Sequence, residues 1–273
     1  MPPLLPAPPP FATAGPAAFT TREAVLGVAG AFVLRNVLSR RETAAWKAHV
    51  AALHAAQGPP PGEAAQQRRD SQHHIPHTVD PSVVAPLAAR IREWLPAQAG
   101  PANAAPLAEA ALSPFLRCYR YVAGDRSAPH YDRSHAEHGP GRGPCVRFTA
   151  YSVILYLDDA CAGGCTTFLE DPATTSNSGL TPRAGAGAAA GAAALEAVAR
   201  VAPRRGDALL FPHGNRPGCH KNWHHEGSTV TAGEKSILRT DVVFDNAVPQ
   251  RKAGRRAGGA CAARCRRRRR GDA

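Results

Sequence analysis

Pro129-His130-Tyr131-Asp132 is the stretch around which this 273-residue chain is organised. In an extended strand, side chains two residues apart point to the same face of the sheet, so His130 and Asp132 can reach one metal ion together. A third ligand must come from elsewhere, and His225 is the candidate. Two imidazoles and one carboxylate leave coordination positions open, which suits non-haem Fe(II) and O₂ chemistry. The pattern therefore predicts an iron site.

The third ligand is selected from the segment His224-His225-Glu226. Adjacent residues of a strand face opposite sides of the sheet, so the two histidines cannot both be ligands. Lys235 follows His225 by ten residues, at the start of what is predicted to be the next strand, and this spacing favours His225.

Other polar residues near these stretches have more than one interpretation. His213 and His220 are interpreted as rim or structural residues. Arg239 follows Lys235 by four residues and faces the same side of a regular strand. It is either a second anion anchor or substrate contact, or the cation of a buried ion pair with Asp241 or Asp245.

The formal net charge of +12 is concentrated in a C-terminal tail. Residues 251–273 contain ten Lys/Arg and one acidic residue, which leaves only +3 for the rest of the chain. The run Arg266 to Arg270 can contact a polyanion in a salt-dependent way. No aromatic residues are interleaved with it, so a solvated tail is the favoured interpretation and polyanion contact the alternative.

The seven cysteines form an odd set without the regular spacing of a disulfide framework. We interpret most of them as reduced thiols, which favours an intracellular compartment, cytoplasm or nucleus. No apolar run approaches the roughly 18 residues of a membrane span, and no secretory signal is visible. An organelle transit peptide stays open because residues 1–20 lack acidic groups, although they also lack arginine.

Composition divides the chain into an arm, one domain and a tail. We predict a disordered Pro/Ala-rich arm over residues 1–23, a domain over 24–250 and a basic disordered tail over 251–273. Within the domain, a helical N-terminal support (24–113) precedes a jelly-roll core (114–245). The core is interrupted by a low-complexity insertion at 176–194, with a helix near 188–200.

Hydrophobic periodicity predicts two helices and a set of strands. A capping box at Ser39–Glu42 begins a helix that ends near His54, and a second helix covers residues 82–95. The predicted strands are 31–34, 115–121, 148–157, 165–169, 207–211 and 235–244. A Gly124-Asp125 turn is expected to fold the His130 segment back beside the 115–121 strand. The fold class is mainly β with flanking helices, built on a double-stranded β-helix (jelly-roll) core.

In this order and spacing, the motifs resemble the 2-oxoglutarate and Fe(II)-dependent dioxygenases, most closely their prolyl 4-hydroxylase-like branch. The resemblance covers residues 115–245 and rests on five features. They are His130-x-Asp132, Tyr121 nine residues earlier, Gly163-Gly164-Cys165-Thr166, His225, and Lys235 ten residues after it.

The resemblance implies roles for these residues. His130, Asp132 and His225 would hold Fe(II), and Lys235 would pair with the far carboxylate of the cosubstrate 2-oxoglutarate. Tyr121 and Thr166 would line the same pocket. O₂ is the second cosubstrate, and ascorbate an optional cofactor. Cys165 departs from the family pattern, where an acidic residue is common at this position.

The expected activity is hydroxylation of a C–H bond, with a prolyl residue of a protein or peptide as the expected substrate. A small metabolite or an alkylated nucleobase is the alternative substrate. The rival from another class is a non-catalytic jelly-roll binding module, which need not retain His130, Asp132, His225 and Lys235 together.

Overall fold

A computed structural model describes eight segments of the chain. They are residues 7–13, 19–57, 74–95, 110–134, 136–138, 146–170, 195–214 and 220–246. The predicted insertion at 176–194 and the predicted tail at 251–273 lie outside the described residues.

The described elements are two helices and fourteen strands. The helices are α1 (Arg40–Gln57) and α3 (Pro81–Arg92). The strands are β1 (Thr21–Ala24), β2 (Phe32–Arg35), β3 (His74–Thr78), β4 (Ala111–Leu112), β5 (Phe115–Val122), β6 (Ser127–His130), β7 (Ala136–His138), β8 (Val146–Tyr156), β9 (Cys161–Gly163), β10 (Thr166–Glu170), β11 (Glu196–Val201), β12 (Ala208–Pro212), β13 (His224–Gly227) and β14 (Val230–Asn246).

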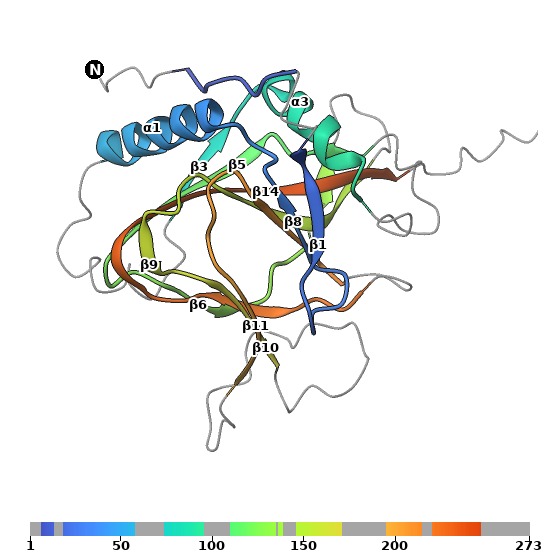
Figure 1. Ribbon diagram of the computed structural model, residues 1–273. Helices are drawn as coiled ribbons and strands as arrows, with labels where there is room; N and C mark the ends of the chain where they lie inside the picture. Colours follow the sequence, from blue (N-terminus) through green and yellow to red (C-terminus); the bar gives the residue numbers. More distant parts are fainter. Residues whose placement is uncertain are drawn as a thin grey trace, which may run out of the picture.

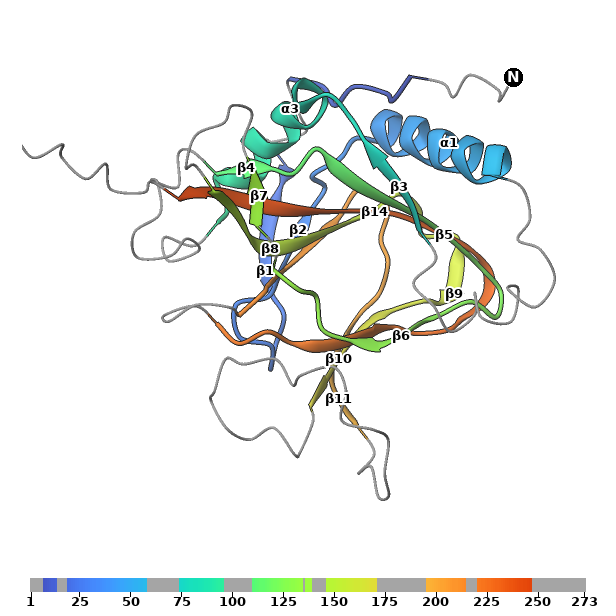
Figure 2. The same ribbon diagram turned by 180° about the vertical axis from the view of Figure 1, so that it is seen from behind.

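Two antiparallel sheets face each other. The larger has the path β1-β2-β12-β8-β14-β5-β3, and the smaller has the order β11-β10-β13-β6. Figures 1 and 2 show the small sheet lying opposite β8, β14 and β5, with the space between the two sheets forming the interior. The predicted mainly-β class with a double-stranded β-helix core is confirmed by this arrangement.

Residue alternation along the strands separates the interior of the barrel from a second core under the helices. On β8, Val153 and Leu155 face the helical layer, whereas Ile154 and Tyr156 face the inside of the barrel. On β14, Lys235, Ile237, Arg239 and Asp241 have the parity of the inner face, so this strand carries charged groups into the barrel.

Helices α1 and α3 cover the outer face of the large sheet (Figure 1). The predicted capping box begins α1: the Ser39 amide donates to Glu42 Oε2 (2.8 Å), and the Glu42 amide donates to Ser39 Oγ (3.2 Å). Asp80 caps α3 by accepting from the Ser82 amide at 2.9 Å. Among the described residues, no helix has both the length and the apolar character needed to cross a membrane.

The described part of the N-terminal arm is ordered, which corrects the prediction of disorder for those residues. Phe11 is buried and stacks on Trp46, with ring centroids 5.1 Å apart. The Ala12 amide donates to Glu42 Oε1 at 2.9 Å, and residues 21–24 form β1. Proline content predicts disorder only where no apolar side chain can be buried, and here Phe11 finds a site on α1.

Two further predictions are wrong. The helix expected near 188–200 is replaced, where the chain is described, by strand β11, which pairs with β10. The His130 segment does not lie beside β5: β6 crosses to the small sheet and pairs with β13, whereas β5 pairs with β14 and β3. The Gly124-Asp125 turn exists, but it carries the chain from one sheet to the other.

Candidate metal centre and anion pocket

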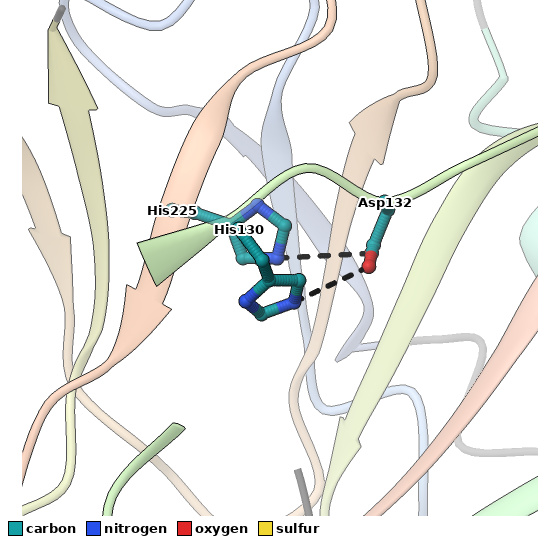
Figure 3. A group of neighbouring side chains, drawn as sticks. All are labelled: His130, Asp132 and His225. Atoms are coloured by element: carbon teal, nitrogen blue, oxygen red, sulfur yellow. Dashed lines mark ion pairs between the residues drawn. The ribbon is translucent and has the colours of Figure 1, made fainter. Parts of the chain in front are cut away.

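Strands β6 and β13 place the two predicted histidine ligands opposite each other. His130 is the register partner of His225, and their ring centroids are 4.3 Å apart. Asp132 follows two residues after the end of β6, and its carboxylate lies to one side of the two rings, within reach of both (Figure 3). The Nε2 atoms of His130 and His225 are 3.4 and 3.7 Å from Oδ1 and Oδ2 of Asp132, respectively.

Backbone carbonyl groups orient both imidazoles. His130 Nδ1 lies 2.8 Å from the Ala128 carbonyl oxygen, and His225 Nδ1 lies 3.0 Å from the Trp223 carbonyl oxygen. A carbonyl oxygen only accepts, so the proton of each neutral ring is on Nδ1. The lone pairs of the two Nε2 atoms are therefore available for a metal ion, an arrangement typical of histidine ligands.

Burial keeps His225 neutral. It lowers the pKa of His225 to about 3, although the nearby Asp132 carboxylate acts in the opposite direction. A neutral imidazole is the form that binds metals, so His225 is ready as a ligand throughout the physiological pH range.

Asp132 is a buried residue with polar partners on its carboxylate and on its backbone carbonyl. Burial by itself would raise its pKa, but the Arg239 guanidinium and the adjacent imidazoles hold the pKa well below its usual range. Arg239 Nη2 lies 2.8 Å from Oδ1, and Ser152 Oγ donates to Oδ2. Asn222 Nδ2 donates to the Asp132 backbone carbonyl at 2.7 Å. The carboxylate is therefore charged and held in one orientation.

Only these three residues form a cluster of metal-ligating side chains in the described part of the chain. One ligand atom each from His130, Asp132 and His225 lies within 4.8 Å of the others. The described histidines of the segment 73–77 lie elsewhere. His77 contacts His49 of α1, with the Nε2 atoms 3.3 Å apart, and His73 lies outside the described residues.

A pocket of about 370 Å³, measured out to its open mouth, adjoins the cluster. Its lining comes from β5, β6, β8, β10, β13 and β14. The lining residues are Tyr119, Tyr121, Ser127, His130, Ile154, Thr166, His225, Glu226, Gly227, Lys235, Ile237 and Arg239. It therefore contains two histidines of the cluster, two buried cations and the predicted cosubstrate contacts.

Lys235 is a cation buried in this pocket with a single neutral partner. It is 3% exposed, and its Nζ donates to the Gly164 carbonyl at 2.6 Å. Within the described segments, no carboxylate lies at ion-pair distance from Nζ. Burial lowers the pKa of Lys235 to about 8. A buried ammonium without a counter-ion is costly, and an anion entering the pocket would compensate it.

Tyr121 and Thr166 both line this pocket. Tyr121 is the register partner of Lys235, whose Nζ lies 5.3 Å from the centre of the tyrosine ring. Thr166 Oγ1 is hydrogen-bonded to the Tyr156 hydroxyl at 2.9 Å. Both tyrosines and the threonine are buried.

Arg239 has a different environment from Lys235. Its Nη2 atom pairs with Asp132 Oδ1 at 2.8 Å and lies 3.7 Å from Asp241 Oδ1. The ion pair foreseen with Asp241 is thus the weaker of two contacts, and the stronger one, to a predicted metal ligand, was not foreseen. The side chain of Asp245 is not described.

Sequence reasoning missed the polar layer behind Asp132. Ser152 Oγ lies 2.9 Å from His213 Nε2, and His213 is buried, so it is not a rim residue. Arg117 pairs with Asp241 Oδ2 at 3.0 Å. One signal was available: Ser152 interrupts the apolar strand at 151–157 at a position that faces the interior.

Comparisons with known proteins found structural matches only. No protein-family model and no curated protein matches the chain. One matched structure is the viral collagen prolyl hydroxylase vCPH from Paramecium Bursaria Chlorella virus-1 in its 2OG complex, at 16% identity over 78% of this chain and 96% of that chain (TM-score 0.43). A Pseudomonas putida prolyl-4-hydroxylase matches at 14% identity over 78% and 92% (TM-score 0.42).

A third match is the non-heme alpha ketoglutarate dependent carbocyclase SnoK from nogalamycin biosynthesis, at 11% identity over 80% of each chain (TM-score 0.47). These three proteins fall within the superfamily to which the sequence motifs bear a resemblance.

Proposed function

We propose that the protein is an Fe(II)- and 2-oxoglutarate-dependent dioxygenase that hydroxylates a C–H bond. One observation carries the proposal. Two imidazoles, of which His225 is kept neutral by burial, and one ionised carboxylate converge beside a pocket that contains a buried lysine with no carboxylate partner among the described residues. A metal centre next to a site for an anion is the combination that this chemistry requires.

The donor set fits Fe(II). His130 and His225 offer Nε2 atoms whose tautomers are set by backbone carbonyls, and Asp132 offers a carboxylate that stays ionised. Two histidines and one carboxylate are the ligands of the non-haem Fe(II) oxygenases, and they leave coordination positions open. His130, Asp132 and His225 would therefore hold the iron.

The pocket fits 2-oxoglutarate, which is a dianion. Lys235 would pair with its terminal carboxylate, in place of the single hydrogen bond to Gly164. Such a pairing would raise the pKa of Lys235 from its lowered value, so protonation and anion binding support each other. Tyr121 and Thr166 would contact the same ligand from β5 and β10.

Bound Fe(II) would supply the activation of O₂. One oxygen atom would convert 2-oxoglutarate to succinate and CO₂, and the other would enter the substrate as a hydroxyl group. The chain contributes orientation and exclusion of water. Phe211 packs edge-on against His225, with ring centroids 4.6 Å apart, and the Phe168 ring lies 5.4 Å from Phe211 and 6.1 Å from His225. Both phenylalanines are fully buried, so the side of the site that faces β12 is dry.

For the substrate, we propose a prolyl residue of a protein or peptide, on the resemblance of the motifs at Tyr121–Lys235 to the prolyl 4-hydroxylase-like branch. A small metabolite or an alkylated nucleobase is the alternative. Ascorbate would act as an accessory reductant.

The rival from another class, a non-catalytic jelly-roll module, is disfavoured by the site itself. A binding module has no reason to keep Lys235 buried and charged, since burial lowers its pKa and leaves it one neutral acceptor. It also has no reason to arrange two Nε2 atoms around an ionised carboxylate.

The test is turnover of 2-oxoglutarate by the full-length protein with Fe(II), O₂ and a panel of proline-containing peptides and small molecules. Succinate formation is the readout, and formation that depends on one substrate identifies its class. His225→Ala should abolish turnover, whereas His224→Ala should retain most of it, because His224 faces away from the cluster. Loss of turnover in His224→Ala alone would contradict the ligand assignment, and absence of succinate under all conditions would favour the binding module.

A further inference from the structure

Arg239 and His130 both lie close to the same carboxylate oxygen of Asp132, which is a predicted metal ligand. Asp132 Oδ1 lies 2.8 Å from Arg239 Nη2 and 3.4 Å from His130 Nε2. A metal ion held by His130 and Asp132 would therefore lie close to a guanidinium group. Arginine stays protonated in proteins, so this positive charge is permanent.

The same guanidinium faces the anion pocket. Arg239 lines the pocket together with Lys235, four residues away on the inner face of β14. Its Nε atom is buried and has no hydrogen-bond partner among the described residues. A buried N–H without a partner is uncommon in native proteins, and an acceptor atom in the pocket would satisfy it.

A second layer of polar groups prevents Arg239 from moving away. Asp241 Oδ1 lies 3.7 Å from Nη2, and Arg117 holds the other oxygen of Asp241 at 3.0 Å. Ser152 Oγ accepts from Nη2 at 3.3 Å, and it lies 2.9 Å from His213 Nε2. All these groups except Arg117 are buried, so the guanidinium is confined next to Asp132.

A confined cation next to a divalent metal ion has opposite effects on two binding steps. It repels the ion, and the repulsion is several times stronger in a protein interior than in water. It attracts an anion that enters the pocket, and the anion then offsets the repulsion between the two cations. The metal alone is thus disfavoured, whereas the metal together with a dianion is favoured.

We infer that Arg239 is a positioning residue that couples metal binding to 2-oxoglutarate binding: it weakens binding of the metal alone and strengthens binding of the pair. The inference rests on the proposed function. It differs from the role of Lys235, because Arg239 acts on both partners through Asp132 and the shared pocket. By thermodynamic linkage, the metal must increase the affinity for 2-oxoglutarate by the same factor.

The experiment measures Mn(II) binding to the full-length, metal-free protein by calorimetry, anaerobically, with and without saturating 2-oxoglutarate. The ratio of the two affinities is the coupling factor. Arg239→Gln keeps a hydrogen-bond donor but removes the charge. We expect this variant to bind Mn(II) alone more tightly than the wild type, and its coupling factor to fall by about fivefold or more. Arg239→Lys, which keeps the charge, should retain most of the coupling.

Arg120→Gln is the matched control. Arg120 forms an exposed ion pair with Glu234 at 2.7 Å on the opposite face of β5 and β14, so its loss should leave the coupling factor unchanged. If Arg239→Gln fails to fold, Arg239→Gln combined with Asp241→Asn removes one buried negative charge together with the positive charge, which keeps the net charge of the polar layer unchanged, and should show the same loss of coupling.

An unchanged coupling factor in Arg239→Gln would overturn the inference. Equal weakening of Mn(II) binding with and without 2-oxoglutarate would also overturn it, because that result describes a hydrogen bond that only orients Asp132. A wild-type protein that binds Mn(II) with no response to 2-oxoglutarate would instead contradict the proposed function. If the wild type shows coupling and the Arg239 variants show the same coupling factor, the proposed function is retained and only the role of Arg239 is contradicted.

Discussion

Lys235 keeps a charge in the protein interior at the expense of stability, and substitution should reveal this. Lys235→Met removes the anchor for the far carboxylate, so the binding free energy of 2-oxoglutarate should weaken by about 2–4 kcal/mol. The same change should raise the free energy of unfolding of the ligand-free protein by about 1–3 kcal/mol, because it removes a poorly compensated buried ammonium. The gain is limited by the loss of the hydrogen bond from Lys235 to Gly164. Calorimetry and urea unfolding at pH 7 measure the two effects.

The sign of the pH dependence follows from the lowered pKa of Lys235, which is about 8 in the ligand-free protein against an ordinary value of 10.5. Below pH 8 the buried lysine is charged, which lowers folding stability and favours the dianion. Above pH 8 it loses its proton, so 2-oxoglutarate affinity should decline and the stability penalty should fade towards pH 10.5. Lys235→Met should show neither trend. A wild-type affinity that rises above pH 8 would contradict the assignment of Lys235.

Helices α1 and α3 are joined by a buried ion pair that also receives the N-terminal arm. Arg90 Nη2 lies 2.7 Å from Glu42 Oε1, and Arg90 Nη1 donates to the Val37 carbonyl at 2.9 Å. Glu42 accepts from the Ala12 amide at 2.9 Å. A carboxylate left in this position without its cation would be strongly unfavourable.

Arg90→Met should therefore lower the free energy of unfolding by about 3–5 kcal/mol, measured by urea denaturation at pH 7. Arg41→Met, at an exposed position of α1, is the control and should change it by less than about 0.5 kcal/mol. Burial would raise the pKa of Glu42, but Arg90 and the Ser39 cap lower it to about 2. Its stabilisation is present above pH 4.5 and lost as the pH falls towards 2, so the variant should unfold at a higher pH in acid titrations.

Strand β14 is the element that connects the two binding functions. It pairs with β5 and β8 in the large sheet and brings Lys235, Arg239 and Asp241 to its inner face. Because a strand alternates faces, the cosubstrate anchor and the coupling cation are spaced four residues apart on one rigid segment. A change of register by one residue on this strand would move all three charges to the outer face of the sheet at once.

For the molecule as a whole, we propose that the basic tail is separate from the site. Every residue assigned to the site lies between Arg117 and Asp241, whereas the net charge resides mainly in residues 251–273. Deleting these residues should leave 2-oxoglutarate turnover intact. Nucleic-acid affinity should collapse on deletion, and in the full-length chain it should decline steeply with salt because counterion release drives such binding.

Filter binding at several salt concentrations, together with succinate formation, measures both effects. Loss of turnover in the shortened protein would show that the tail supports the fold or the site. Strong, salt-insensitive and sequence-selective binding by residues 1–250 would instead favour a nucleobase as the substrate over a prolyl residue.

Local sequence patterns were sufficient to predict most helices and strands and the grouping of His130, Asp132 and His225. The capping box at Ser39 and the apolar periodicity of residues 82–91 predicted both helices, because capping and helical periodicity depend on neighbours within a few residues. The spacing of His130, Asp132, His225 and Lys235 predicted one shared site. The structure brings the first three side chains together and places Lys235 in the adjoining pocket, whereas their roles towards a metal ion and a cosubstrate stay predictions.

Contacts between distant segments could not be read from such patterns. The contact of Phe11 with Trp46 joins residues 35 positions apart, and the pairing of Arg239 with Asp132 joins residues 107 positions apart. The path of β6 to the small sheet depends on which sheet a strand enters. The alternation of residues along a strand shows which face of the sheet a side chain occupies. The residues that it contacts there are determined by how the two sheets close into a barrel. From the sequence, Arg239 could anchor an anion, contact the substrate or pair with an acidic residue of its own strand. The position of Asp132, after β6 crosses between the sheets, makes the Asp132 carboxylate its nearest partner.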